Sequence, residues 1–284
     1  MKRNITTILL VFILIIGLSL LLYPTVSEYI NSKNQSRAVR DYSARVMEMN
    51  DDSSDSMLDE ARRYNEELAN TSGTIIHPER VSGYDEILDV TGTGIMGYVS
   101  IPKIDVELPI YHGVDEDVLQ IAAGHLPGTS MPVSGGDSHI VLSGHRGLPS
   151  ALLFTRLDEL EKGDTFQISV LKEQYTYEID QIKIVLPDEL DDLAIEEGKE
   201  YCTLMTCTPY GVNSHRLLVR GIRIDTAKEG ESNYITNEAY QIDPVIVMPV
   251  LAIPMFGIWM IVLGIKYLKK KKHEKRKWKG INLA

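Results

Sequence analysis

Two long apolar runs stand near the two ends of this chain. The first covers residues 5–22 and contains no charged side chain. The second covers residues 245–265 and includes two prolines, which membrane helices tolerate where neighbours satisfy the freed carbonyls. A helix needs about 17 to 25 residues to cross a bilayer. The pattern therefore predicts two transmembrane helices, at 5–23 and 245–266.

Basic residues flank each run on its terminal side. Lys2 and Arg3 precede the first run, and a lysine-rich tail at 267–284 follows the second. Because cytoplasmic flanks are rich in Lys and Arg, both termini are predicted to be cytoplasmic and the residues between the runs extracellular. A cleavable signal peptide is the alternative for the first run, but residues 22–28 offer no small-residue cleavage site. We expect residues 1–4 to be a short cytoplasmic end.

The stretch at 24–94 is predicted to be a helical extension that ends in a loop. Apolar residues recur at helical spacing as far as about residue 71, which predicts one or two amphipathic helices. The acidic stretch 51–56 is expected to interrupt them, with a new helix beginning near Ser56. Residues 73–94 contain Pro78 and several glycines and read as a loop.

From residue 95 the pattern changes to short β-branched runs separated by turn residues. Such runs, with few helices between them, indicate a mostly antiparallel sandwich or a closed barrel at 95–226, followed by a linker at 227–244. Short helices are expected at 116–123 and 154–160. The predicted strands are 96–101, 108–111, 138–143, 165–170, 174–185, 201–206 and 215–224.

Charge limits the partners of the extracellular part. The whole chain has 29 basic and 40 acidic residues, and the two tails outside the apolar runs hold 11 of the basic residues but only one of the acidic ones. Between the two apolar runs 18 basic and 39 acidic residues remain, a formal charge of about −21. Nucleic-acid binding needs a cationic surface, so no nucleic-acid partner is predicted.

The chain has two cysteines, Cys202 and Cys207. In a strand they point to opposite faces, and five residues at ~3.3 Å each place their α-carbons ~16 Å apart, beyond the ~7 Å limit of a disulfide. Both thiols are therefore predicted to be free. Cys202 is expected to be a small buried side chain, whereas Cys207 ends the strand and is expected to be exposed.

Three residue types that suit acyl transfer are expected at one end of the sheet. A thiol such as Cys207 becomes nucleophilic as the thiolate, which a nearby imidazole or cation favours. His145 follows the strand 138–143, and imidazole can return a proton to a leaving amine. Arg216 begins the strand after Cys207, and its guanidinium is a fixed donor for a developing oxyanion.

His125 and His215 are not expected to be catalytic. His125 lies near a glycine-rich turn and is predicted to be hydrogen-bonded rather than catalytic. His215 should point to the face opposite Arg216. Asp137 and His139 have too few other ligands around them to suggest a metal site, so no metal or other cofactor is predicted.

The segment Thr203-Leu-Met-Thr-Cys207 resembles the Thr-Leu-x-Thr-Cys signature of sortases, with an arginine and an upstream histidine at the expected distances. The resemblance covers about residues 95–224. It extends to the segments Gly97-Tyr-Val-Ser-Ile-Pro-Lys-Ile, Leu108-Pro-Ile-Tyr-His-Gly, Gly124-His-Leu-Pro-Gly-Thr-Ser and Ser143-Gly-His-Arg-Gly-Leu-Pro-Ser.

This resemblance implies a closed eight-stranded barrel that cleaves a Leu-Pro-x-Thr-Gly-like signal between Thr and Gly. Cys207 would form a thioacyl enzyme and pass the acyl group to an amine. By the same resemblance His145 is the acid/base and Arg216 the oxyanion or substrate-positioning residue. Thr206, beside the nucleophile, is predicted to contact the substrate, and the chemistry requires no metal.

The two apolar runs, the helical extension and the motifs around His125 and His145 most resemble class C sortases, which join pilin subunits through a lysine amine of the next pilin. Class C enzymes commonly carry an Asp-Pro-aromatic lid motif before the barrel, and this chain has none. The nearest candidate is His77-Pro78-Glu79, which lacks the aromatic residue. The alternative is that residues 73–94 form a lid of another kind.

Three other functions compete with this one. A sortase can instead attach surface proteins to the peptidoglycan precursor. A papain-like protease is disfavoured because its cysteine precedes its histidine, whereas His145 precedes Cys207 here. The alternative without catalysis is an acidic surface-binding module with an incidental thiol.

Overall fold

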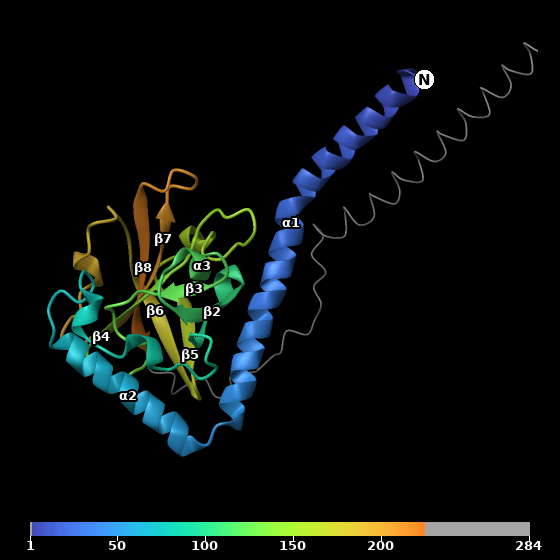
Figure 1. Ribbon diagram of the computed structural model, residues 1–284. Helices are drawn as coiled ribbons and strands as arrows, with labels where there is room; N and C mark the ends of the chain where they lie inside the picture. Colours follow the sequence, from blue (N-terminus) through green and yellow to red (C-terminus); the bar gives the residue numbers. More distant parts are fainter. Residues whose placement is uncertain (1, 225–284) are drawn as a thin grey trace, which may run out of the picture. The chain divides into compact units, whose positions relative to one another are not determined.

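The computed structural model describes residues 2–224 (Figure 1). These residues divide between two compact units, one ending at Val26 and one beginning at Ser27. The predicted linker at 227–244, the second transmembrane helix at 245–266 and the basic tail at 267–284 lie outside the described residues.

Two long helices precede the strands. α1 (Lys2–Glu48) includes the first apolar run and is long and apolar enough to cross a membrane by length and composition. α2 (Asp51–Ala69) begins directly after Asn50, whose side chain accepts the Ser53 N–H at 2.7 Å. The predicted interruption at 51–56 is therefore wrong, because Asn50 caps the helix and the acidic residues form its first turn.

The second half of α1 and α2 both pack on the strands. On α1, the Tyr42 hydroxyl donates to the Met96 carbonyl at 3.1 Å and accepts the Leu171 N–H at 2.8 Å. On α2, Asn65 binds both the N–H and the C=O of Met131, at 2.7 and 3.1 Å. The apolar face of α2, at helical spacing, is buried against the core. Its buried apolar residues are Leu58, Ala61, Tyr64 and Leu68.

In the described part of the chain, eight strands form one closed barrel in the order β1-β2-β3-β4-β7-β8-β6-β5. The pairs β2–β3 and β4–β7 are parallel and the other pairs are antiparallel. The predicted closed, mostly antiparallel barrel is confirmed. The strands are β1 (Ile95–Ile101), β2 (Val106–His112), β3 (Ala123–His125), β4 (Ser138–Ser143), β5 (Thr165–Val170), β6 (Glu173–Val185), β7 (Glu200–Thr208) and β8 (His215–Ile224).

The sequence did not predict β3, and the helix expected at 116–123 ends at Leu119. α3 (Glu116–Leu119) is a single turn, and the residues that follow it enter the barrel as β3 between β2 and β4. The second expected helix, at 154–160, contracts to the turn η4 (Leu157–Glu159). The other short turns are η1 (Pro78–Arg80), η2 (Tyr84–Glu86), η3 (Pro102–Ile104) and η5 (Asp191–Leu193).

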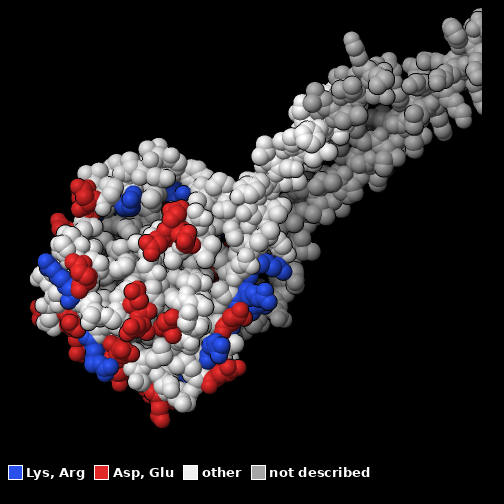
Figure 2. All heavy atoms as spheres, viewed as in Figure 1, with Lys and Arg blue, Asp and Glu red and all other residues white. Residues whose placement is uncertain are grey.

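The segment 73–94 is only partly a surface loop. Val81, Ile87 and Leu88 are buried in the core, so the second half of the segment is packed against the barrel. In the view of Figure 2, acidic side chains are scattered over the surface with basic ones among them.

Candidate functional site

Three neighbouring strands bring the predicted catalytic residues to one end of the barrel. Cys207 on β7 and Arg216 on β8 are Cα partners in the antiparallel ladder. β4 runs parallel to β7, with Ser143 opposite Met205, and the next residue donates its N–H to the Met205 carbonyl at 3.0 Å. Because both parallel strands end in the same direction, His145 leaves the sheet at the end where Cys207 stands.

Side-chain alternation on β7 separates the two thiols. Cys202 and Leu204 point into the core, whereas Met205 and Cys207 lie on the outer face and are partly exposed. Both cysteines are free, and burial raises the pKa of the Cys202 thiol well above its usual value. The exposed thiol of the pair is therefore the one at the strand end.

Thr206, which was predicted to contact substrate, lies on the inner face of β7. Its side chain is buried, and its hydroxyl donates to the Gly144 carbonyl at 2.7 Å. The structure thus does not bring Thr206 to the face of Cys207. The hydroxyl instead holds the backbone immediately before His145.

Arg216 differs from the other arginines of its strand. Arg220 binds both carboxylate oxygens of Asp180, at 3.1 and 2.6 Å, and Arg223 lies 3.9 Å from the Glu200 carboxylate. Among the described residues Arg216 has no carboxylate within ion-pair distance, and it donates only to the carbonyl of the preceding residue at 3.3 Å. The positive charge of its guanidinium is therefore available to bind a group of the substrate.

His145 faces a carboxylate that the sequence did not single out. The Glu116 carboxylate, on α3, lies 3.3 Å from Nε2, close enough for an ion pair with the protonated imidazole, although its angle is not that of a hydrogen bond. A hydrogen bond from Gln120, and after it the charge of His145, hold the pKa of the Glu116 carboxyl below its usual value. Glu116 is mostly exposed, so solvent screens this interaction.

The turn that carries His145 is tightly packed. A side chain at Gly144 would place its Cβ 2.6 Å from the Phe154 ring, so only glycine fits there. Arg146 binds the Asp158 carboxylate and also donates to the Thr208 hydroxyl at 3.3 Å. Arg146 therefore joins the His145 turn to the end of β7.

An apolar cluster on the outer face lies beside Met205, two residues before Cys207. Its buried members are Val141, Val185, Leu193 and Leu218. Ile75, from the segment 73–94, packs against this cluster, as do Leu126 and Leu190. Of the lid candidate His77-Pro78-Glu79, His77 precedes the turn η1 and the other two residues begin it, with side chains that are 50% exposed at His77 and 73% at Glu79. The apolar contact of this segment is thus made by Ile75.

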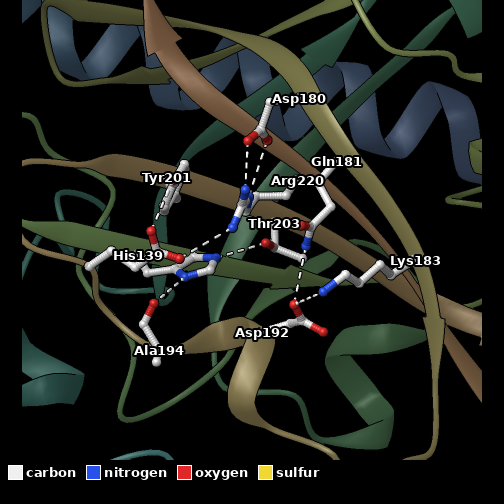
Figure 3. Close-up of polar contacts among 10 residues, drawn as sticks. His139, Asp180, Gln181, Lys183, Asp192, Ala194, Tyr201, Thr203 and Arg220 are labelled. Atoms are coloured by element: carbon white, nitrogen blue, oxygen red, sulfur yellow. Dashed lines mark hydrogen bonds and ion pairs between the residues drawn. The ribbon is translucent and has the colours of Figure 1, made fainter.

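Figure 3 shows a polar cluster farther along the same outer face. His139 donates from Nδ1 to the Ala194 carbonyl at 2.9 Å, so its Nε2 accepts from the Thr203 hydroxyl at 2.8 Å. Burial lowers the pKa of His139 to about 4, which keeps the ring neutral. Arg220 lies 4.0 Å from the centroid of the Tyr201 ring. The cluster fixes the segment before β7 to β4 and β7.

His125 and His215 each make a polar contact within the fold. His125 is fully buried, with Nε2 2.8 Å from the Ser130 carbonyl, and burial lowers its pKa to about 4. His215 is opposite Thr208 in the ladder, and its Nδ1 lies 2.8 Å from the Ser214 hydroxyl. Asp137 accepts the Gly198 N–H at 2.7 Å and does not share the contacts of His139.

Comparison with known proteins gives concordant matches. The sortase domain model matches residues 99–224. Sortase D of Bacillus subtilis is 38% identical over 131 residues, which are 45% of this chain and 63% of that protein. The chain therefore aligns with somewhat less than two thirds of the length of this curated relative.

Solved structures match more of the chain. Sortase C1 of Streptococcus agalactiae is 48% identical, with a TM-score of 0.61, and the match covers 66% of this chain and 98% of that one. Clostridium perfringens sortase C, in a structure with the C-terminal cell wall sorting motif, is 39% identical, with a TM-score of 0.59, and the match covers 67% of this chain and 99% of that one.

Proposed function

This chain belongs to the sortase family of cysteine transpeptidases, and we propose on that basis that it cleaves a Leu-Pro-x-Thr-Gly-like sorting signal and joins the new carboxyl end to a lysine amine of a pilin. The observation that carries the proposal is the register pairing of Cys207 with Arg216, an arginine without a carboxylate partner among the described residues, at the strand end where the His145 turn begins.

In the first half-reaction the Cys207 thiolate attacks the Thr carbonyl carbon of the signal. An S–C bond forms, and the carbonyl oxygen takes up negative charge that the Arg216 guanidinium stabilises. The C–N bond to Gly then breaks, and His145 gives its proton to the departing amine. The product is a thioester on Cys207.

In the second half-reaction a lysine amine attacks the thioester carbon. His145 accepts the proton that the amine loses, the C–S bond breaks and an isopeptide bond forms. The Glu116 carboxylate lies 3.3 Å from the imidazole Nε2, so it faces the ring that exchanges the proton with the amine in both half-reactions. Cys207 is regenerated as a thiolate, so no other reactant is consumed.

The apolar cluster of Val141, Val185, Leu193 and Leu218 is proposed to receive the Leu-Pro part of the signal. It shares the outer face with Cys207 and lies beside Met205. Ile75 packs on this cluster, so we propose residues 73–76 as a cover over it. The Thr74 hydroxyl donates to the Gly128 carbonyl at 2.8 Å and holds the cover in place. His77, Pro78 and Glu79 would then be the exposed continuation of this cover.

The proposed location is the cell membrane, with the barrel outside the cell. The support is the apolar first part of α1 and the basic flanks of both apolar runs. A two-pass arrangement with both termini in the cytoplasm stays a prediction from the sequence.

The experiment that tests the acceptor is an assembly reaction with purified pilin that carries a sorting signal and no other amine acceptor. A covalent ladder on denaturing gels is expected from the full chain and not from Cys207→Ala. Absence of the ladder together with efficient transfer to a peptidoglycan-type amine would instead assign the chain to the anchoring of surface proteins.

A further inference from the structure

The loop that begins at His145 is closed on itself at its base. The Phe154 N–H donates to the His145 carbonyl at 3.2 Å, and the Gly147 N–H donates to the Thr155 hydroxyl at 3.1 Å. A β-bridge between Leu148 and Ala151 narrows the loop further. Because these bonds leave the loop little freedom, a force on its tip is transmitted to the backbone of His145.

Two side chains of α1 hold the tip of that loop. The Glu28 carboxylate accepts the Leu152 N–H at 2.6 Å, and the Asn31 amide donates to the Ser150 carbonyl at 2.8 Å. The two α1 residues are three positions apart and so lie on one face of the helix. Together they satisfy one donor and one acceptor of the loop backbone.

The same face of α1 reaches the segment that carries Glu116. Gln35, one turn after Asn31, donates to the Ile121 carbonyl at 2.9 Å. Ile121 in turn donates its N–H to the Val118 carbonyl of α3. Glu116 begins α3 and places its carboxylate 3.3 Å from His145 Nε2. Both the backbone of His145 and its facing carboxylate are thus connected to one short stretch of α1.

We propose that Glu28, Asn31 and Gln35 are positioning residues for His145, and we call them the α1 clamp. This inference rests on the proposed function, since it assigns His145 the proton transfers. The clamp begins five residues after the predicted anchor, so the segment that leaves the membrane also orients the acid/base. Misplacing a catalytic group by about 1 Å can cost ~100-fold in rate, so loss of two loop contacts should be visible in kcat.

The test uses the full chain in detergent micelles and a quenched fluorescent peptide containing Leu-Pro-Ala-Thr-Gly. The double variant Glu28→Ala, Asn31→Ala is expected to lower kcat about tenfold with KM changed less than about twofold. Glu28→Gln should retain most of the activity, because its amide oxygen still accepts the Leu152 N–H. The matched control is Asn34→Ala, an exposed residue of the same helix.

A double variant with the kcat of the wild type would overturn the clamp. A loss of kcat that comes with an equal loss in Glu28→Gln, or with a lower melting temperature, would overturn it as well, because either result indicates general destabilisation. If the wild type does not cleave the peptide, the proposed function fails. In that case the clamp is tested by iodoacetamide alkylation of Cys207 between pH 5 and 9, a reaction to which the buried Cys202 does not contribute. An alkylation rate whose pH profile is altered in the double variant supports the clamp, and an unchanged profile contradicts it.

Discussion

Cys207 and Arg216 are register partners on β7 and β8, so the thiol and the guanidinium start from the same face with β-carbons about 5 Å apart. Four residues along β8, Arg220 donates from Nε and Nη2 to the two carboxylate oxygens of Asp180. The same strand therefore carries one arginine that is used in the fold and one that is available to a substrate.

Arg216→Lys should lower kcat/KM for a sorting-signal peptide by about 100-fold, because one ammonium does not reproduce the planar guanidinium at the oxyanion. The melting temperature should stay unchanged, since Arg216 makes no ion pair among the described residues. The control is Arg223→Lys, on the same strand beside Glu200, which should keep its activity. Peptide turnover at the wild-type rate in Arg216→Lys would remove the oxyanion role.

Ile75→Ser should increase the cleavage of a soluble peptide. Loss of the apolar contact weakens the cover by about 1.4 kcal/mol, which corresponds to about a tenfold larger open population. Ile76→Ser is the matched control, because Ile76 is 67% exposed. Deletion of all of 73–94 would be a poorer test, since it removes the buried Ile87 and Leu88. Equal rates in both variants and the wild type would leave the cover without a function.

The two buried histidines should make the fold sensitive to acid. Burial lowers the pKa of His125 and His139 to about 4, while in the unfolded chain a histidine titrates near 6.5. As the pH falls from about 6.5 to about 4 the unfolded chain binds protons that the folded chain does not, so stability is present above pH 6.5 and is lost on acidification. Each histidine contributes about 3 kcal/mol to this loss.

Urea unfolding of the full chain at several pH values measures this effect. His139→Gln should reduce the slope of unfolding free energy against pH by up to about 1.4 kcal/mol per pH unit between 4 and 6.5. His125→Gln should do the same independently. A slope in either variant that equals the wild-type slope would show that the histidine is already protonated in the folded protein.

The sequence predicted the strands well because most are β-branched runs that end at turn residues. It did not predict β3, since Ala123, Gly124 and His125 have little strand preference and are held by pairing with β2 and β4. The start of α2 was also misplaced, because the acidic residues at 51–56 suit the first turn of a helix as well as a loop.

At the site, local sequence motifs predicted the functional residues on or directly after the strands but not those on the more distant connecting segments. The spacing of Cys207 and Arg216 follows from two consecutive strands, so it can be inferred from the chain alone. Glu116 reaches His145, and Ile75 reaches the apolar cluster, from segments distant in sequence, and short patterns around them carry no signal of their partners. The sequence predicts a substrate contact for Thr206, whereas strand alternation turns its side chain to the inner face of the barrel.

The most direct test of the account is the intact mass of the full chain after incubation with a Leu-Pro-x-Thr-Gly peptide and no amine acceptor. We predict an added mass equal to the peptide cleaved after Thr, located by fragmentation on Cys207 and released by hydroxylamine, and no such adduct on Cys207→Ala. An adduct-free wild type, or an adduct that persists in Cys207→Ala, would contradict the assignment of Cys207 as the nucleophile.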